Sequence, residues 1–496
     1  MKEILARIAQ YAEERPHHIA LSDGTAVFTY RVLQLAVERL ASTLHAKRIG
    51  LLLANGCAWT IIDLAISQRG AACIPMPSFF SDAQLDHLIR DAGLDLIITD
   101  QSTRVRGLLK TPPAMEMTVA GNRLDCFVTA SAQKASLPSH IAKITYTSGT
   151  TDQPKGVCLT GEAIEGVTIS LSNAVAAGME DRALSLLPLS ALLANIGGIY
   201  APLYSGGTAY VPDLAKCGMS GSTGAHPDLL VETLRRFQPT VIILVPYLLK
   251  MLVIAAAQGI RLPASLRYIA VGGAATAPTL IERARALDLP VYQGYGLSEA
   301  ASVVSLNLPG HDRRGSAGRP LPHVGVRIAD DGEVMVKGNL FSAYLGQPPR
   351  RDDEWPTGDT GFLDDQGYLY ITGRKKTAFA TAHGRNLSPE WIESELTANP
   401  AISQAMLFGE GRDFNVAVIV PNNGTATLKV DQAVTKLNRS LPDYAQVTHW
   451  IIANEPFSVS NGLATGAGTP DRQAIADRYA SQIERLYQRD LSHAVL

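Results

Sequence analysis

The sequence has almost no excess of charge of either sign. Its 44 lysine and arginine residues are balanced by 46 aspartate and glutamate residues, which gives a formal net charge of −2. A chain without a basic surplus lacks the electrostatic attraction that holds nucleic acid or an anionic membrane surface. Charged residues make up 18% and hydrophobic residues 46% of the chain, a balance that excludes a disordered scaffold. We therefore expect a folded protein with no nucleic-acid partner.

Cysteine is scarce and scattered. The chain has 5 cysteines, an odd number without a Cys-x-x-Cys pair. This pattern excludes a disulfide framework and a cysteine-based zinc site, and it favours a reducing cytoplasmic location. Each cysteine is expected to be a small buried apolar residue. They are Cys57, Cys73, Cys126, Cys158 and Cys217.

Long apolar runs are also missing. The strongest candidate, residues 241–257 (VIILVPYLLKMLVIAAA), is shorter than the ~20 residues of a typical membrane span and contains Pro246 and Lys250. It predicts a buried strand, a proline turn and a packed helix. Residues 1–8 form an amphipathic pattern with charges throughout, unlike a secretory signal. We expect a cytoplasmic protein without an integral membrane segment.

Alternating strand-like and helix-like segments fill most of the chain. At 496 residues it exceeds the roughly 250–300 residues of a single core, so two or three domains are expected. The alternation predicts an α/β fold with parallel sheets covered by helices. Strands are predicted at 50–53, 72–74, 96–98, 141–145, 182–187, 208–211, 240–245 and 268–271, and helices at 30–45, 81–92, 161–177 and 227–237. Beyond residue 290 the predicted strands (324–329, 333–337 and 368–372) are shorter and separated by more turns.

A domain boundary is predicted near residues 373–376 (GRKK), just after a turn-rich segment at 355–359. We place an N-terminal domain at 1–374 and a C-terminal domain at 375–496, a unit of about 120 residues. A helix of the second domain is expected to begin with Ser388 as its N-cap and proline at the next position.

The most distinctive motif is TYTSGTTDQPKG at residues 145–156, directly after a predicted strand. Glycine lets a backbone approach a ligand, hydroxyl and N–H groups donate hydrogen bonds, and lysine supplies a positive charge, so the loop is suited to polyphosphate. It is not a GxxxxGK[ST] loop, because glycine follows the lysine. The alternative is a polar surface turn, but the Pro-Lys-Gly ending favours phosphate binding. The predicted phosphate ligands are Thr147, Ser148, Gly149, Thr150, Thr151 and Lys155.

This loop resembles the phosphate loop of the adenylate-forming (AMP-forming) acyl-activating superfamily, which includes acyl-CoA synthetases and stand-alone adenylation enzymes. The resemblance extends along the chain and implies a large domain of helix-covered β-sheets with a β-barrel-like subdomain, followed by a small mobile α+β domain. It also implies two reactions. A carboxylic acid and ATP give an acyl-adenylate, and a thiol of CoA or of a phosphopantetheine carrier then displaces AMP.

Two further segments resemble the family's nucleotide site. QGYGLSE at 293–299 has serine in place of the usual threonine, and Gly272, Gly273 and Ala274 follow a predicted strand. By resemblance, Tyr295 and the 272–274 turn enclose adenine, Ser298 contacts the α-phosphate and Glu299 holds Mg²⁺. A hydroxyl and a hard oxygen ligand suit an ATP–Mg²⁺ complex. Lys155, Ser298 and Glu299 are therefore the predicted catalytic residues.

The resemblance assigns roles at the domain boundary as well. Asp359 and Arg374 are implied to bind the ribose, and Lys376 is implied to be the hinge about which the C-terminal domain rotates between the two reactions. Gly384 and Arg385 would line the path of the thiol. An acyl carrier protein is therefore one candidate partner, beside the carboxylic acid substrate.

One residue departs from the family pattern. Relatives carry a lysine near the C-terminus that neutralises charge during adenylation, whereas the aligned position here is close to Thr469, and no lysine follows Asn461. Losing such a contact commonly costs ~10²–10³ in rate. Thr469 and Pro470 instead fit the N-cap and first position of a terminal helix. Arg472 is an alternative source of positive charge, although the neighbouring Asp471 would weaken it.

The acyl substrate is less well defined by the sequence. Small residues, Ser190 and Ala191, stand where many relatives have an aromatic residue and a histidine; they either reshape the acyl pocket or simply pack. The segment around Asn461 resembles the long-chain fatty acid branch. The leading hypothesis is an ATP-dependent ligase for a fatty acid. The alternatives are an enzyme that uses a preformed acyl-adenylate or an amine or hydroxyl acceptor, and a nucleotide-binding pseudoenzyme.

Overall fold

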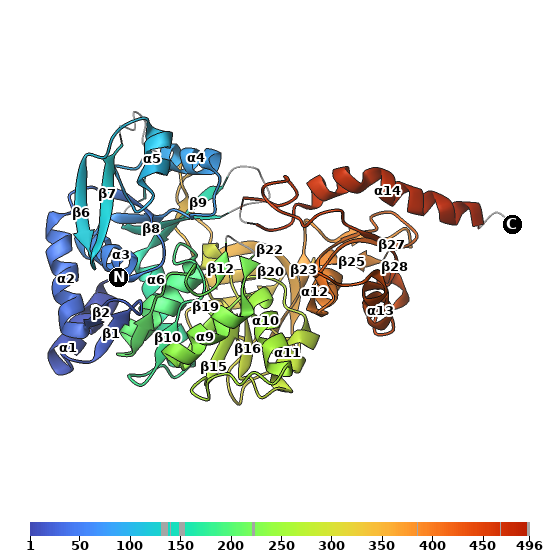
Figure 1. Cartoon of the computed structure of the whole chain (residues 1–496), viewed down its shortest axis with the longest axis horizontal. Helices are drawn as coiled ribbons and strands as arrows, with labels where there is room; N and C mark the ends of the chain where they lie inside the picture. The colour runs from blue at the N-terminus through green and yellow to red at the C-terminus, as the bar shows by residue number, and fades with distance from the viewer. Residues whose placement is uncertain are drawn as a thin grey trace.

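The structure is a computed structural model of the 496-residue chain. It describes residues 1–129, 137–138, 140–147, 154–220, 224–383, 385–466 and 468–493. Figure 1 shows a large body from the N-terminus to β23 and a small domain from β24 to α14, which extends to one side.

Within the described residues, a nine-stranded sheet has the order β18-β17-β16-β15-β14-β10-β11-β1-β2, and its central pairs from β16 to β11 are parallel. Its strands are β1 (Ile19–Ser22), β2 (Val27–Thr29), β10 (Arg182–Leu184), β11 (Thr208–Tyr210), β14 (Val241–Leu244), β15 (Tyr268–Val271), β16 (Val291–Tyr295), β17 (Ser305–Leu306) and β18 (Arg319–Pro320). A two-residue pair, β12 (Met219–Ser220) and β13 (Gly224–Ala225), stands apart from it.

An eight-stranded sheet has the order β21-β9-β8-β4-β3-β5-β7-β6. Every residue of β3, β4 and β5 is buried, as expected for strands covered on both faces. The strands are β3 (Arg48–Leu52), β4 (Ala72–Pro75), β5 (Leu96–Thr99), β6 (Met115–Val119), β7 (Asn122–Val128), β8 (Ile141–Thr147), β9 (Lys155–Thr160) and β21 (Ala343–Tyr344).

Helices between the two sheets form the main core, because one buried cluster contains their residues and residues of both sheets. These helices are α1 (Lys2–Glu14), α2 (Tyr30–Thr43), α3 (Cys57–Arg69), α6 (Gly161–Ala174), α7 (Leu192–Asn195), the π-helix η1 (Ile196–Tyr200) and α8 (Ala201–Tyr204). Outer helices α4 (Asp82–Ala92) and α5 (Ser102–Leu109) cover the eight-stranded sheet, and α9 (Pro227–Phe237), α10 (Pro246–Ala257) and α11 (Pro278–Arg285) cover the nine-stranded sheet.

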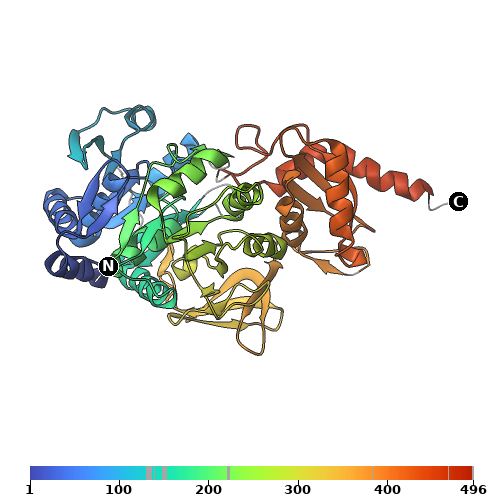
Figure 2. The ribbon, with the colours of Figure 1, turned by 60° about the horizontal axis from the view of Figure 1, so that its bottom comes forward.

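A four-stranded antiparallel sheet completes the large body (Figure 2), in the order β19-β20-β22-β23. Its strands are β19 (Val324–Ile328), β20 (Glu333–Gly338), β22 (Glu354–Leu363) and β23 (Leu369–Arg374). The prediction of a turn-rich segment at 355–359 is wrong, because these residues lie inside β22. The strand tolerates Pro356 and Gly358 because its pairing with β20 contains a register shift.

The small domain has a three-stranded sheet of β26 (Ile402–Phe408), β27 (Asn415–Pro421) and β28 (Val447–Ile452). Successive residues of β27 face opposite sides, so Ala417 packs toward α12 and α13 while Val418 packs toward α14. The remaining elements are β24 (Phe379–Ala380), β25 (Asn386–Leu387), α12 (Pro389–Ala398), α13 (Thr427–Asn438), the short turn η3 (Asp443–Ala445) and α14 (Arg472–His493).

Two expectations are confirmed. All five cysteines are buried free thiols. The segment 241–257 divides into β14 and α10, with Pro246 opening the helix. Among the described residues, no helix combines the length and the apolar character needed to cross a bilayer.

Candidate functional site

The site lies where strands of both large sheets end. β15 and β16 run parallel with Val271 opposite Gln293, so the 272–274 turn after β15 lies beside Tyr295 at the end of β16. From the other sheet, β8 ends at Thr147 directly opposite Lys155, the first residue of β9. The predicted ligands Ser148, Gly149, Thr150 and Thr151 lie outside the described residues.

One group of side chains surrounds Asp359 on β22. Its carboxylate accepts a 2.6 Å hydrogen bond from the Tyr295 hydroxyl and forms a 2.7 Å ion pair with Nε of Arg374. Asp359 is buried whereas Arg374 is half-exposed. Burial raises the pKa of Asp359, and the pKa of Tyr295 is raised by burial and by that carboxylate. The structure thus brings three predicted nucleotide-site residues together, although they come from different parts of the chain.

A second group centres on Tyr344, which sequence reasoning missed. Its hydroxyl donates a 2.7 Å hydrogen bond to Oε1 of Glu299, and Nζ of Lys155 lies 5.7 Å from the centre of its ring. Burial, and then Glu299, raise the pKa of Tyr344. β21 places this ring by pairing with β9, where Tyr344 stands opposite Val157. Since that pairing joins distant segments, no local pattern in the sequence could have identified it.

Aromatic packing fixes the position of Tyr344. Phe341 and Trp355 both meet its ring edge-on, with centroids 5.0 and 5.9 Å away. The backbone N–H of Phe341 also donates a 2.7 Å hydrogen bond to the carbonyl of Glu299. Backbone and side chain of Glu299 are therefore held by the same short segment.

The turn that carries Ser298 and Glu299 (η2, Ser298–Ala300) has unusual backbone angles directly after it. Ala301 and Ser302 have positive φ angles of 55° and 106°. A side chain at Gly296 would meet the carbonyl oxygen of Ser302 at 1.6 Å, so this close approach requires glycine. Strained backbone of this kind is found preferentially at functional sites.

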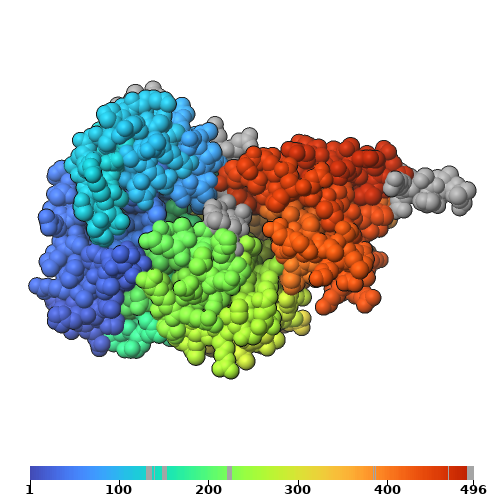
Figure 3. Space-filling view, in the orientation of Figure 1, coloured from blue at the N-terminus to red at the C-terminus, as the bar shows by residue number. Residues whose placement is uncertain are grey.

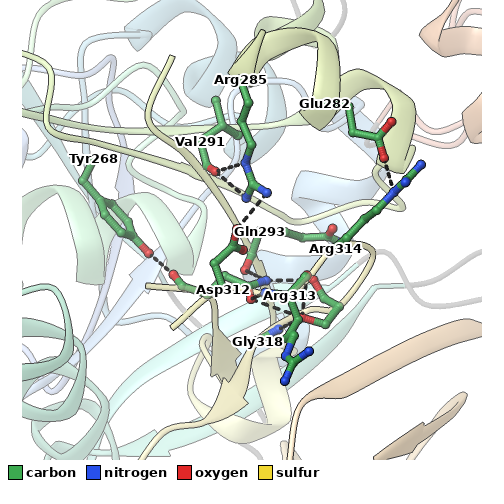
Figure 4. Close-up of polar contacts among 11 residues, drawn as sticks. Tyr268, Glu282, Arg285, Val291, Gln293, Asp312, Arg313, Arg314 and Gly318 are labelled. Carbon is green, nitrogen blue, oxygen red and sulfur yellow. Dashed lines mark hydrogen bonds and ion pairs between the residues drawn. The ribbon is translucent and has the colours of Figure 1, made fainter. Parts of the chain in front are cut away.

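A polar network behind β16 anchors the strand that carries Tyr295 (Figure 4). Asn307 is buried, and its amide donates to the carbonyls of Gln293 and Ser316 at 3.1 and 2.8 Å. Arg285 donates to the carbonyl of Val291 at 2.9 Å and pairs with Asp312 at 2.7 Å. The start and the middle of β16 are thus bonded by side chains from α11 and from the segment that follows β17.

Comparison with known proteins agrees with this geometry. A family model described as AMP-binding enzyme matches residues 8–344, and the model of the AMP-binding enzyme C-terminal domain matches residues 377–491. The chain belongs to the AMP-binding enzyme family.

Relatives in this family include the long-chain-fatty-acid–CoA ligase FadD15 of Mycobacterium tuberculosis, 27% identical over 89% of this chain and 88% of the relative. Feruloyl-CoA synthase of Amycolatopsis is 27% identical over 87% of this chain and 91% of the relative. Among solved structures, the anthranilate CoA ligase AuaEII with anthranoyl-AMP has a TM-score of 0.80, with 18% identity and 96% of both chains covered. o-Succinylbenzoate CoA synthetase of Bacillus subtilis with ATP and magnesium ion has a TM-score of 0.73 and 23% identity, with 94% of this chain and 98% of that chain covered.

The expected adenylation loop of the family has a different local structure from the one predicted. α14 begins at Arg472, and its N-cap is Asp471, whose carboxylate accepts a 3.0 Å hydrogen bond from Ala474 N–H. The prediction that Thr469 and Pro470 open the helix is therefore wrong. Thr469 is exposed, and its carbonyl accepts a 2.8 Å hydrogen bond from Thr465 N–H in a small hairpin.

Arg472 is engaged elsewhere. Its guanidinium forms a 2.7 Å ion pair with Glu393 of α12 and donates to the carbonyl of Leu407 at 2.6 Å. Burial raises the pKa of Glu393, while Arg472 lowers it. A buried carboxylate would lose its partner if Arg472 left, which costs several kcal/mol. In this orientation Arg472 therefore does not supply the missing lysine's charge.

The predicted hinge lies in a compact turn. Nζ of Lys375 binds Asp331 at 2.5 Å and Glu333 at 2.8 Å. A side chain at Gly373 would meet Oγ of Ser388, the residue that precedes α12, at 2.1 Å, so the two parts of the chain touch here through a glycine. Ser388 is the predicted N-cap. Its hydroxyl bonds the carboxylate of Glu390 at 2.8 Å rather than a helix N–H, although the helix begins as expected.

Glu299 would supply part of the coordination of a magnesium ion. Among the residues that the structure describes, no group of three or more His, Cys, Asp or Glu side chains is arranged to hold a metal ion. Glu299 binds the hydroxyl of Tyr344, whose ring Lys155 faces, and Mg²⁺ is usually bound through one or two carboxylates together with substrate phosphates. Glu299 meets that description.

Proposed function

We propose that the protein activates a carboxylic acid, with a fatty acid as the leading candidate, by forming an acyl-adenylate from ATP and then transfers the acyl group to a thiol of CoA or of a carrier-protein pantetheine. The observation that carries this proposal is the presence of two groups of side chains where strands of different sheets end. Tyr295, Asp359 and Arg374 suit a nucleoside, while Lys155 and Glu299 suit its phosphates and metal.

In the first reaction a carboxylate oxygen of the acid attacks the α-phosphorus of ATP, and pyrophosphate leaves. Asp359 accepts hydrogen bonds from the ribose hydroxyls once its present partner Tyr295 turns to the adenine. Lys155, Thr147 and the 148–151 loop bind the phosphates, and Ser298 contacts the α-phosphate. Glu299 would hold Mg²⁺, which would supply positive charge beside the phosphates. Positioning and electrostatic stabilisation account for the rate.

In the second reaction the thiol sulfur attacks the acyl carbon, AMP leaves, and the thiol proton passes to solvent or to the leaving phosphate. We propose that residues 1–374 and 375–496 are the two domains and that the second rotates about Lys376 between the reactions. Arg385, which is exposed, then lines the thiol path with Gly384, which lies outside the described residues. A cytoplasmic location and an acyl carrier protein partner belong to the same proposal.

The fatty acid is favoured because the FadD15 relatives act on long-chain fatty acids by name. Other relatives are named feruloyl-CoA synthase and 2-succinylbenzoate–CoA ligase, so aromatic acids are also candidate substrates. The substrate screen therefore has to include fatty and aryl acids.

A second candidate function is supported by the adenylation loop. Thr469 carries no positive charge and Arg472 is bound to Glu393. An enzyme that takes a preformed acyl-adenylate, or one that passes an acyl group to an amine or hydroxyl, fits this loop. A nucleotide-binding pseudoenzyme fits it as well.

Acid-dependent ATP–pyrophosphate exchange tests the proposal, with fatty, aryl and amino acids as substrates and Lys155→Ala as the control. We expect exchange with at least one acid, and its loss in the control. ATP binding without exchange for any acid contradicts the proposal and favours the second candidate. A Thr469→Lys variant is expected to increase exchange by up to ~10²-fold, because it restores a charge that stabilises the transition state.

A further inference from the structure

The small domain is attached to the large body at the C-terminal end of α12. Nζ of Lys250, from α10, donates hydrogen bonds to the carbonyls of Thr397 at 2.7 Å and Ile402 at 2.6 Å. The last carbonyls of a helix have no partner within the helix, and a cation there is favoured by the helix dipole. A lysine of one domain therefore caps a helix of the other.

Two neighbouring contacts reinforce this cap. Arg283 of α11 donates to the carbonyl of Ala398 at 3.0 Å, and the hydroxyl of Thr279 donates to Glu395 at 2.6 Å. The side chain of Ala398 is buried in the apolar cluster of α10 and α11. The end of α12 is thus held by two cations, one hydroxyl and an apolar contact.

The ammonium of Lys250 is largely removed from water in this position. Its side chain is buried, with 8% of the residue exposed. Burial, followed by the nearby positive charge of Arg283, lowers the pKa of Lys250 to about 8. Glu395 is the charged group that faces the contact from α12, and burial raises its pKa. Lys250 therefore gains two hydrogen-bond partners in this position while losing water.

The docked orientation brings a particular part of the small domain to the large body. A side chain at Gly466 would overlap the amide of Gln84 on α4, so Gly466 lies directly against that helix. Figure 3 shows the red part of the small domain in contact with the blue part of the large body that includes α4. His87, one turn along α4, contacts the carbonyl of Pro154 at 3.1 Å, next to the phosphate-loop segment.

The backbone of Ala380 and Ala382, close in sequence to the proposed thiol-path residues, bonds within the small domain. Ala382 N–H donates to the carbonyl of Arg412 at 3.0 Å, and Gly411 N–H donates to the carbonyl of Ala380 at 2.8 Å. His383 and Arg385 are exposed. This orientation therefore presents Gly466 to the large body, while Ala380 and Ala382 bond within the small domain.

We propose that Lys250 and Arg283 form an interdomain latch that holds the small domain in its adenylation orientation and must release α12 before thiol transfer. The proposal rests on the function proposed above. Both are positioning residues, because they touch the end of α12 and not the reacting atoms. Removing the Lys250 ammonium leaves two carbonyls unpaired, which shifts the docking equilibrium by about 10-fold for each.

A spin-label distance measurement on the full chain tests the latch without substrates. Labels are attached at Val128→Cys in the large body and Leu428→Cys in α13, which are 63% and 66% exposed, while the five native cysteines are buried. We expect one dominant distance in the parent and in the matched control Lys47→Met, an exposed lysine. In Lys250→Met we expect a second distance, from the undocked state, whose population is more than 10-fold higher than in the parent.

Arg283→Met should shift the distribution in the same direction, and Lys250→Arg, which keeps the charge, should restore part of the parent distribution. Unchanged distances in both Lys250→Met and Arg283→Met overturn the latch. Thermal unfolding of each variant confirms that the domains stay folded, and a misfolded Lys250→Met leaves Arg283→Met to decide.

The two half-reactions supply a functional measurement. Lys250→Met should slow pyrophosphate exchange about 10-fold and leave thioester formation from a supplied acyl-adenylate unchanged or faster. Equal slowing of both reactions overturns the assignment of the latch to one orientation. If the parent shows no exchange with any acid, the proposed function fails, and the spin-label distances still decide whether the latch exists.

Discussion

Replacing Lys143 with methionine should destabilise the large body strongly. Lys143 on β8 is 1% exposed, and its ammonium binds Asp63 on α3 at 2.8 Å, the amide oxygen of Asn195 at 2.5 Å and the hydroxyl of Tyr200 at 3.0 Å. Removing it leaves the fully buried Asp63 with Tyr200 and Asn195 as hydrogen-bond donors and without a counter-charge. Breaking a buried ion pair in this way costs ~3–5 kcal/mol.

The double variant Lys143→Met, Asp63→Leu separates the loss of a charge partner from the loss of packing. Since apolar replacement of a whole buried pair is commonly neutral, the double variant should recover most of the lost stability, to within about 1–2 kcal/mol of the parent. Urea unfolding gives the free energies, and hydrogen exchange of β8 and α3 peptides locates the change. A single variant that loses less than about 1 kcal/mol, or a double variant as unstable as the sum of the singles, refutes this reasoning.

Three further predictions concern the site and the domain contact. Tyr344→Phe should lower kcat up to about 10-fold and raise the Mg²⁺ concentration for half-maximal exchange, because Glu299 loses the hydroxyl that orients it; an unchanged Mg²⁺ titration contradicts this. Ser302→Gly should stabilise the fold by about 1 kcal/mol in thermal unfolding, since its φ of 106° is costly for serine; a lower Tm contradicts the strain. Docking should strengthen as the pH rises from about 8 to 10.5, because docked Lys250, with its pKa lowered to about 8, loses its proton before the undocked form does. Burial raises the pKa of Glu395, the carboxylate that faces this contact, and spin-label distances that do not change over the interval contradict the prediction.

Local patterns in the sequence predicted much of the fold. Tyr268–Val271 and Pro227–Phe237 have the predicted bounds, because an apolar run between turns and a proline-led amphipathic segment are each decided by neighbouring residues. The 355–359 segment was misjudged because proline and glycine usually mark turns, whereas pairing with β20 and β23 makes it a strand. Tertiary pairing overrides local preference there.

The same limit applies to the site. The positions of Tyr295, Asp359 and Arg374 could be predicted from motifs, but not that they would bond one another. Tyr344 could not be predicted, because its position depends on the pairing of β21 with β9. The polar network of Asn307 is equally a product of loops that meet only in the folded chain.

The structure also changes the meaning of the missing lysine. Had Thr469 capped α14, the demands of folding would have explained its presence, but Asp471 provides the cap. The Thr469 side chain is exposed, and its hairpin is held through backbone atoms that any residue possesses. A lysine could therefore occupy this position at little cost to packing, so stability does not require its absence. We propose that the substitution bears on the reaction instead, either on the rate of adenylation or on the source of the acyl-adenylate, and that the two proposed functions differ at Thr469.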